Sequence, residues 1–169
     1  MSRDEFLKVE KPALDQLQYH KRWSYKDGRE LSPDTSDIRS SLKDVILTSN
    51  LEEAIQRINP WISDENLQKI VSEVLMIESS TLMMSNQWFW NYLTQYTSVE
   101  EDSKNGRRSR TVKLIDFENI KNNEFLCVNQ YKIQGPTENI IPDIILFVNG
   151  LPLGVIECKS PSKTNAMAA

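Results

Sequence analysis

The chain has 169 residues, of which 39% are hydrophobic and 26% are charged, as is ordinary for a globular protein. Its formal net charge of −4 argues against a surface that is basic all over, although a local basic stripe remains compatible with it. No apolar run approaches the ~18 residues of a membrane span, and acids near the start replace the apolar core of a secretion signal, so we expect a cytoplasmic protein that does not enter a membrane. One histidine (His20) and two cysteines (Cys127 and Cys158) nearly exclude a zinc cage, and we interpret the cysteines as reduced thiols.

The first 97 residues are predicted to be mainly helical. Helices are expected over residues 8–19, 39–48, 50–58 and 81–95, and Asn50 followed by Glu53 resembles a capping pair. A further helix is expected after Ser63, which we predict to be its capping residue. Apolar residues follow Ser63 at spacings that place them on one helical face: Leu67, Ile70, Val71, Val74 and Leu75.

Residues 110–160 are predicted to form strands, after an exposed hairpin or loop over 98–110. The segment 111–117 alternates between apolar and polar residues, and 125–133 is rich in residues that favour strands. Two apolar runs are joined by Asn149-Gly150, a strong signal for a β-hairpin. Helices followed by strands predict an α/β domain with a central mixed sheet of four or five strands, flanked by helices.

Charged residues gather at one end of this predicted hairpin. Asp143 stands at the start of the first strand, and Glu157 and Lys159 share one face of the second strand, with Cys158 on the other face. Charges beside such apolar strands need a partner, and Mg²⁺ is one because it binds one or two carboxylates and keeps several waters. In such a site Lys159 would orient a water molecule or offset developing negative charge.

The register of the hairpin decides whether the carboxylates can meet. A two-residue turn at Asn149-Gly150 places Asp143 opposite Ile156, one position short of Glu157. A three-residue loop, or a bulge in one strand, places Asp143 opposite Glu157. We therefore predict an odd-length loop or a bulge, which agrees with Pro152 directly after the turn.

The spacing of Pro142-Asp143 and Glu157-x-Lys159 resembles the PD-(D/E)xK nuclease signature. Further segments resemble the N-terminal domain of the restriction (R) subunit of type I restriction-modification enzymes, densely from about residue 110 to 169. These segments are Leu114 to Phe117, Asn122 to Phe125, Val128 to Gln130 and Pro142 to Pro161. The resemblance is weaker upstream, where residues 51–60 resemble the family's helix that ends in Asn-Pro.

The resemblance implies a restriction-endonuclease-like fold and Mg²⁺-dependent hydrolysis of double-stranded DNA. It assigns metal binding to Asp143, Glu157 and the backbone carbonyl of Cys158, and catalysis to Asp143, Glu157 and Lys159. Such domains usually hold a further acid on the first core helix, and Glu10 is our candidate for that metal ligand. The implied partners are the methyltransferase (M) and specificity (S) subunits. ATP would be used by a DNA-translocating motor elsewhere in the subunit.

The family's Gln-x-x-x-Tyr motif is missing, because no glutamine follows Gln134 and the chain stops at Ala169, inside the expected helix. No segment resembles a P-loop. We therefore expect one endonuclease domain over residues 1–169 of a longer protein, with a helical region (1–97), a sheet core (110–160) and a truncated helix (161–169).

Other readings stay open. A basic run could bind DNA phosphates or form a solvated loop, and it comprises Lys104, Arg107, Arg108 and Arg110. The aromatic residues 88–90 could stack on bases, but helical spacing favours a core or a docking face. The whole chain could instead be an interaction module that docks the R subunit onto the methyltransferase core or the motor, with a vestigial site. It could also be a stand-alone nuclease of the same fold.

Overall fold

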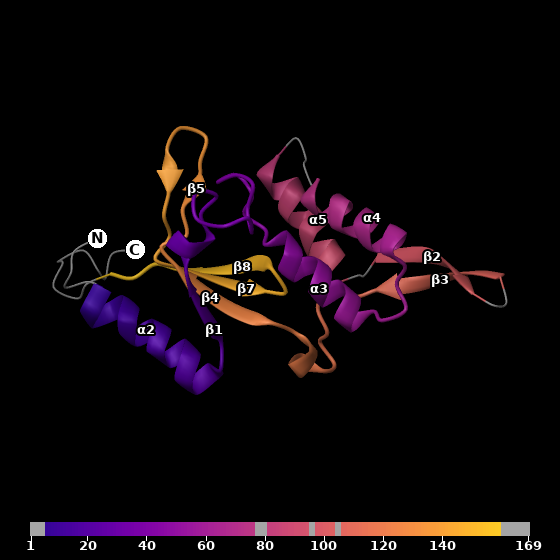
Figure 1. Cartoon of the computed structure of the whole chain (residues 1–169), viewed down its shortest axis with the longest axis horizontal. Coiled ribbons are helices and arrows are strands. Elements are labelled where there is room, and N and C mark those ends of the chain that lie inside the picture. Colours follow the sequence, from indigo (N-terminus) through magenta and orange to yellow (C-terminus); the bar gives the residue numbers. More distant parts are fainter. Residues whose placement is uncertain (1–5, 77–80, 95–96, 104–105, 160–169) are drawn as a thin grey trace. The chain divides into compact units, whose positions relative to one another are not determined.

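The computed structural model describes residues 6–76, 81–94, 97–103 and 106–159, and its contacts divide the chain into two compact units (Figure 1). The sheet unit comprises residues 1–45 and 125–169, and the helical unit comprises residues 46–124. The predicted helix over 161–169 lies outside the described residues. Across the described ranges, each helix is too short or too polar to cross a membrane.

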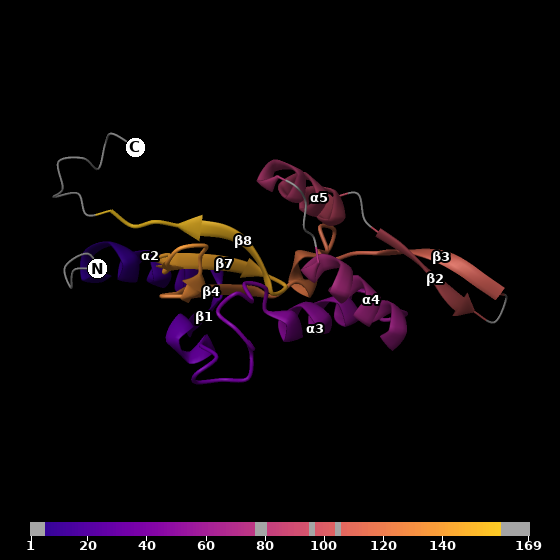
Figure 2. The same cartoon turned by 90° about the horizontal axis from the view of Figure 1, so that it is seen from above.

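A four-stranded mixed sheet forms the centre of the sheet unit. Its strands follow in the order β1-β4-β7-β8, and Figure 2 shows them next to one another in this order. Strand β1 is parallel to β4, whereas the other neighbours are antiparallel. The bounds are β1 Ser24–Asp27, β4 Phe125–Asn129, β7 Ile144–Val148 and β8 Leu151–Ile156. The prediction of a mixed α/β fold is confirmed, but β1 lies within the region that was predicted to be helical or loop.

The first helix covers one face of this sheet. It is continuous over three adjoining helical segments, which are η1 (Phe6–Glu10), α2 (Lys11–Asp15) and η2 (Gln16–His20). Leu14 packs against Cys127 of β4 and Ile144 of β7, and half-buried Cys158 joins the same cluster. The predicted helix over 8–19 is therefore confirmed, and its apolar face holds it on the sheet.

The predicted helix over 39–48 is wrong, because this segment is irregular after the short turn η3 (Gly28–Leu31). The buried guanidinium of Arg39 donates hydrogen bonds to the backbone oxygens of Asp44 (2.7 Å), Leu42 (3.0 Å) and Lys132 (3.0 Å). It also lies 4.1 Å from the centre of the Tyr131 ring. These side-chain bonds replace the backbone bonds that a helix would make here.

Strands β7 and β8 form the predicted hairpin with a bulge. Asn149 and Gly150 both adopt positive φ angles (52° and 77°), as a tight two-residue hairpin turn requires. Phe147 then pairs with Pro152, but Leu146 pairs with Gly154, so Leu153 is the extra residue of the bulge. The last pair is Ile144 with Ile156, and continuing this register places Asp143 opposite Glu157. The bulge, and not an odd-length loop, satisfies the prediction.

Two further strands of the sheet unit pair with each other only. They are β5 (Ile133–Gln134) and β6 (Asn139–Ile140). The predicted strand over 125–133 is interrupted before β5, because Gln130 has a positive φ angle of 53°. Such a backbone is uncommon outside glycine and ends the pairing with β7.

The helical unit contains three helices and an antiparallel hairpin. These elements are α3 (Thr48–Ile58), α4 (Asp64–Leu75), α5 (Leu82–Thr94), β2 (Thr97–Ser103), β3 (Gly106–Val112) and the short η4 (Ile120–Asn122). Ser63 caps α4 as predicted, with its hydroxyl accepting the backbone N–H of Asn66 (3.4 Å). The predicted cap at Asn50 is wrong, because α3 begins earlier and the Asn50 amide donates to Glu124 (2.9 Å).

The predicted strand over 111–117 is also wrong, because β3 ends at Val112. The buried Asn59 amide accepts the Lys113 N–H (3.0 Å) and donates to the Lys113 carbonyl (2.8 Å). The Asp116 carboxylate accepts the N–H groups of Glu118 (3.1 Å) and Asn119 (2.9 Å). Side chains thus form hydrogen bonds with these backbone N–H and carbonyl groups, which therefore need no partner on a neighbouring strand.

Candidate functional site

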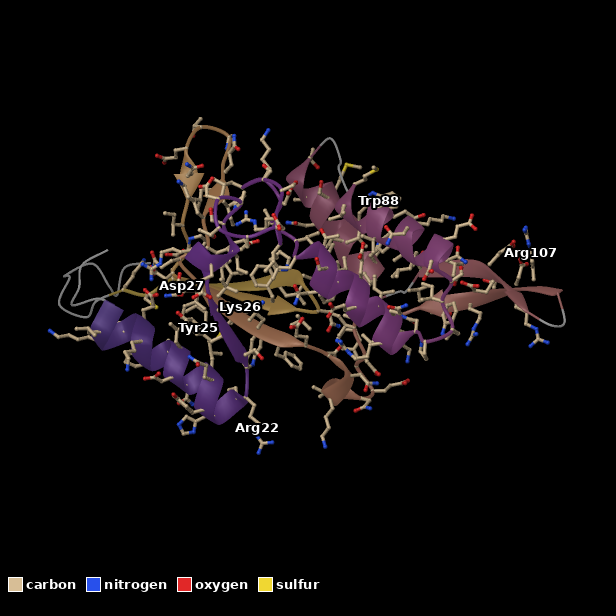
Figure 3. The ribbon with its side chains drawn as sticks, viewed as in Figure 1. Arg22, Tyr25, Lys26, Asp27, Trp88 and Arg107 are labelled. Atoms are coloured by element: carbon tan, nitrogen blue, oxygen red, sulfur yellow. The ribbon has the colours of Figure 1, made fainter. Side chains whose placement is uncertain are left out.

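Polar residues gather at one edge of the four-stranded sheet. Because β1, β4 and β8 end where β7 begins, the next positions beyond the last paired row are Gly28, Gln130, Asp143 and Glu157. The last paired row itself contains Asp27 and Asn129. Figure 3 shows Asp27 at this end of β1. All four strands therefore bring polar residues to this one edge of the sheet.

The Asp143 carboxylate lies against the Glu157-Cys158-Lys159 segment. Its Oδ2 atom accepts a hydrogen bond from the backbone N–H of Cys158 at 2.6 Å. A bond from an N–H group to a carboxylate is stronger than one to a neutral acceptor, and it fixes the position of half-buried Asp143. Glu157 and Lys159 directly follow β8, and both are exposed, whereas Cys158 turns toward the core. This alternation agrees with the predicted faces.

Glu10, the last residue of η1, is fully buried. Its Oε1 atom accepts a hydrogen bond from the Asn129 amide at 2.8 Å, but its Oε2 atom has no hydrogen-bond partner within the described part of the chain. Burial raises the pKa of Glu10, the hydrogen bond from Asn129 opposes this, the negative charge of Asp143 raises the pKa further, and the nearby Gln130 side chain lowers it. Glu10 is thus a buried acid whose pKa is raised further by the charge of Asp143, and its Oε2 atom accepts no hydrogen bond within the described ranges.

A divalent cation of the Mg²⁺ type fits these residues. A buried carboxylate oxygen without a donor is costly, and a hard cation is one of the few partners that would satisfy it. Within the described ranges, no three His, Cys, Asp or Glu side chains stand close enough together to form a complete cage. Mg²⁺ does not need one, because it keeps several waters and binds through one or two carboxylates.

The predicted basic run lies on the β2–β3 hairpin of the helical unit. Lys104 falls outside the described residues. Arg107, which Figure 3 shows on this hairpin, forms an ion pair with Asp102 (3.2 Å), and Arg110 stacks on Trp61 at 4.1 Å from the ring centre. Arg108 pairs across the strands with Glu101. DNA binding by these arginines stays a prediction, and the acids on β2 reduce the positive charge that they would present.

Sequence reasoning did not assign a role to Asn129, which contacts Glu10, or to Tyr25, which contacts Asn129. Asn129 appeared only within a family motif, and Tyr25 lies on β1, the strand that was not predicted. The Tyr25 hydroxyl donates to the Asn129 side-chain oxygen at 2.9 Å. A polar residue that ends the apolar run 125–128 was the available signal for Asn129, whereas no signal in the sequence indicated Tyr25.

A mixed sheet, a helix packed on one face and acidic residues at one edge together define a restriction-endonuclease-like α/β fold. The chain belongs to the family described as the type I restriction enzyme R protein N terminus, which it matches over residues 3–169. The family resemblance inferred from the sequence is therefore confirmed.

Curated relatives agree with this family. The chain is 37% identical over 163 residues to a putative type I restriction enzyme MjaIXP endonuclease subunit of Methanocaldococcus jannaschii, an alignment that covers 95% of this chain and 15% of the relative. It is 33% identical over 160 residues to the type I restriction enzyme HindI endonuclease subunit of Haemophilus influenzae, covering 94% of this chain and 15% of that relative. The chain thus spans about 15% of the length of these relatives.

Proposed function

We propose that this chain is the Mg²⁺-dependent endonuclease domain of a type I restriction enzyme R subunit. The observation that carries the proposal is the hydrogen bond from the Cys158 N–H to Asp143, together with the bulge at Leu153 that sets the register. The relatives are named endonuclease subunits, which supports a nuclease of this class. Cleavage would act on double-stranded DNA after ATP-driven translocation by a motor that this chain does not contain.

The proposed roles follow from charge and position. Asp143 and Glu157 would hold the cation with the backbone carbonyl of Cys158, and Glu10 would contribute its free Oε2 atom. The cation would polarise the phosphate and lower the pKa of a bound water. Lys159 is exposed and carries a mobile ammonium group, so it would orient the attacking water and offset the charge that develops on phosphorus oxygens. One P–O bond would form to the water oxygen while the P–O bond to the leaving sugar oxygen breaks, and the proton that the water loses would be balanced by the proton that the leaving oxygen takes up from solvent.

The proposed partners are DNA and the methyltransferase and specificity subunits of the same system. Sequence recognition would belong to the specificity subunit, so this domain would contact the DNA backbone instead of the bases. The arginines of the β2–β3 hairpin remain candidates for such phosphate contacts.

The decisive experiment places Asp143→Asn and Lys159→Ala separately in the full-length subunit, assembled with its partner subunits. We expect each to reduce DNA cleavage by at least about 100-fold while ATP hydrolysis and translocation continue, because the motor lies outside this chain. Glu138→Gln, which changes an exposed acid in the turn between β5 and β6, is the matched control and should cleave normally. Undiminished cleavage by Asp143→Asn would refute the proposal.

One observation favours a second candidate, an interaction module with a vestigial site. Helix α5 exposes large apolar side chains, among them Trp88 (58% exposed) and Trp90 (64%). Mn²⁺ distinguishes the candidates, since a cation that binds only the folded chain raises its melting temperature. A shift that Asp143→Asn abolishes supports the nuclease, whereas no shift in the unaltered chain supports the docking module.

A further inference from the structure

Glu10 is held by a chain of hydrogen bonds that begins on β1. The Tyr25 hydroxyl donates to Oδ1 of Asn129 (2.9 Å), and Nδ2 of Asn129 donates to Oε1 of Glu10 (2.8 Å). Tyr25, Asn129 and Glu10 come from three segments, and the bonds join residues 104 and 119 positions apart in the sequence. Asn129 is 3% exposed and Glu10 is fully buried, so water cannot readily replace the bond between them.

The direction of these bonds fixes the orientation of the Asn129 amide. The phenol of Tyr25 is protonated at neutral pH and offers one donor, which an amide oxygen accepts. The amide nitrogen then faces Glu10. The reversed amide would point its oxygen at an ionised carboxylate and lose that hydrogen bond, so the Tyr25 hydroxyl and the Glu10 charge favour the same orientation.

The backbone around Asn129 leaves little room for movement. A Cβ atom on Gly28 would lie 2.6 Å from the Asn129 carbonyl oxygen and from the Tyr131 nitrogen, so β1 and β4 approach each other closely here. Gln130 follows Asn129 with a positive φ angle of 53°. A rigid asparagine on a close-packed strand end can hold a carboxylate in one position.

We propose that Asn129, oriented by Tyr25, is a positioning residue that holds Oε1 of Glu10 so that Oε2 stays available to a divalent cation. The inference rests on the proposed function and adds to it two residues that do not touch the cation. Partners of metal ligands fix the orientation of the ligand, and their loss typically lowers metal affinity about 10- to 100-fold.

The test measures Mn²⁺ binding to the 169-residue chain by the loss of the free Mn²⁺ paramagnetic resonance signal. Asn129→Leu keeps the approximate size of the side chain and removes both hydrogen bonds, and we expect it to raise the Kd for Mn²⁺ by about 10-fold or more. Tyr25→Phe removes only the hydroxyl and should raise the Kd by a smaller factor. If Asn129→Leu fails to fold, Tyr25→Phe alone still tests the proposal.

Asn59→Leu is the matched control, because Asn59 is also a buried asparagine with hydrogen bonds at both ends of its amide, but in the helical unit. It should lower the melting temperature and leave the Kd for Mn²⁺ unchanged. Wild-type affinity in a folded Asn129→Leu or Tyr25→Phe chain would overturn the positioning role.

Two reference variants separate this inference from the proposed function. If Asp143→Asn and Glu10→Gln weaken Mn²⁺ binding while Asn129→Leu does not, only the positioning role fails. If Asp143→Asn binds Mn²⁺ as tightly as the unaltered chain, the proposed metal site fails, and the positioning role fails with it.

Discussion

Glu10 and Glu101 are both buried glutamates, one in each unit, yet their surroundings are opposite. Oε1 of Glu101 accepts hydrogen bonds from the Ser63 N–H (2.8 Å), the Ser63 hydroxyl (2.9 Å) and the Asn66 amide (2.8 Å). These donors hold the pKa of Glu101 below its usual range. Oε1 of Glu10 accepts a hydrogen bond from the Asn129 amide, Oε2 accepts none within the described ranges, and burial raises the pKa of Glu10.

The difference separates a carboxylate that stabilises the fold through its hydrogen bonds from one whose buried charge destabilises it. Glu101 joins the start of α4 to the β2–β3 hairpin, and its negative charge is balanced by donors. Glu10 makes the sheet unit less stable whenever it is ionised, because Oε2 is buried without a donor. A residue that costs stability in the free protein is typical of a ligand-binding site.

Inserting one alanine between Ile156 and Glu157 should have the largest effect, because it moves the acidic residues out of alignment. The strand pairs up to Ile144 with Ile156 would keep their register, Asp143 would face the inserted alanine, and Glu157 would move to the opposite face of the sheet. We expect the Mn²⁺-induced rise in melting temperature to disappear completely. Melting curves with and without Mn²⁺ measure this.

Leu153→Ala is the control for the insertion, since it shortens a half-exposed side chain and keeps the register. It should retain the full Mn²⁺ response. An insertion variant that still folds and responds to Mn²⁺ like the unaltered chain would show that the alignment of Asp143 with Glu157 does not matter for the site.

Glu101→Gln should lower stability and leave the metal response intact. A neutral amide accepts weaker hydrogen bonds than a carboxylate, so we expect a loss of about 1 kcal/mol in the free energy of unfolding. For a chain of this size that corresponds to a fall of about 3 °C in melting temperature. An unchanged melting temperature would mean that Glu101 is not the structural acid that its hydrogen bonds indicate.

Glu10→Gln should act in the opposite direction without metal. The amide keeps an oxygen that can accept from Asn129 and removes the buried charge, so we expect a rise of about 1–3 °C in melting temperature. Addition of Mn²⁺ should then stabilise this variant less than the unaltered chain. A fall in the metal-free melting temperature would contradict the view that ionised Glu10 is destabilising.

Local patterns predicted much of the fold, and they failed where long-range contacts decide the structure. The helix after Ser63 and the Asn149-Gly150 hairpin depend on spacing within one segment, so both were predicted. Strand β1 has only four residues, three of them exposed, and it exists because it pairs with β4 about 100 residues later. The segment around Arg39 is irregular because one buried guanidinium binds three backbone oxygens, which no local pattern indicates.

The features of the candidate site likewise divide into those that local patterns predicted and those that depend on long-range contacts. Register reasoning predicted that an extra residue would place Asp143 opposite Glu157, and the bulge at Leu153 confirms this alignment. The role of Glu10 came from the family resemblance alone. The chain from Tyr25 through Asn129 to Glu10 could not be predicted, because it joins three segments whose packing the sequence does not state. The catalytic and metal-binding roles remain predictions.

The dependence of stability on pH should distinguish the two glutamates in the metal-free chain. The pKa of Glu10 is raised in the folded state, so its ionisation lowers the free energy of unfolding at neutral pH, and this penalty fades as the pH falls through the raised folded pKa toward the ordinary value. The melting temperatures of the unaltered chain and Glu10→Gln should therefore converge on mild acidification.

The pKa of Glu101 is lowered, so its contribution to stability persists above the ordinary glutamate pKa and is lost only as the pH falls through the lower folded pKa. The gap between the unaltered chain and Glu101→Gln should accordingly survive the pH range in which the Glu10 gap closes. Melting curves of the three chains, recorded from about pH 7.5 to 4 without divalent cations, measure both gaps, and parallel curves for Glu10→Gln would show that Glu10 titrates like an exposed glutamate.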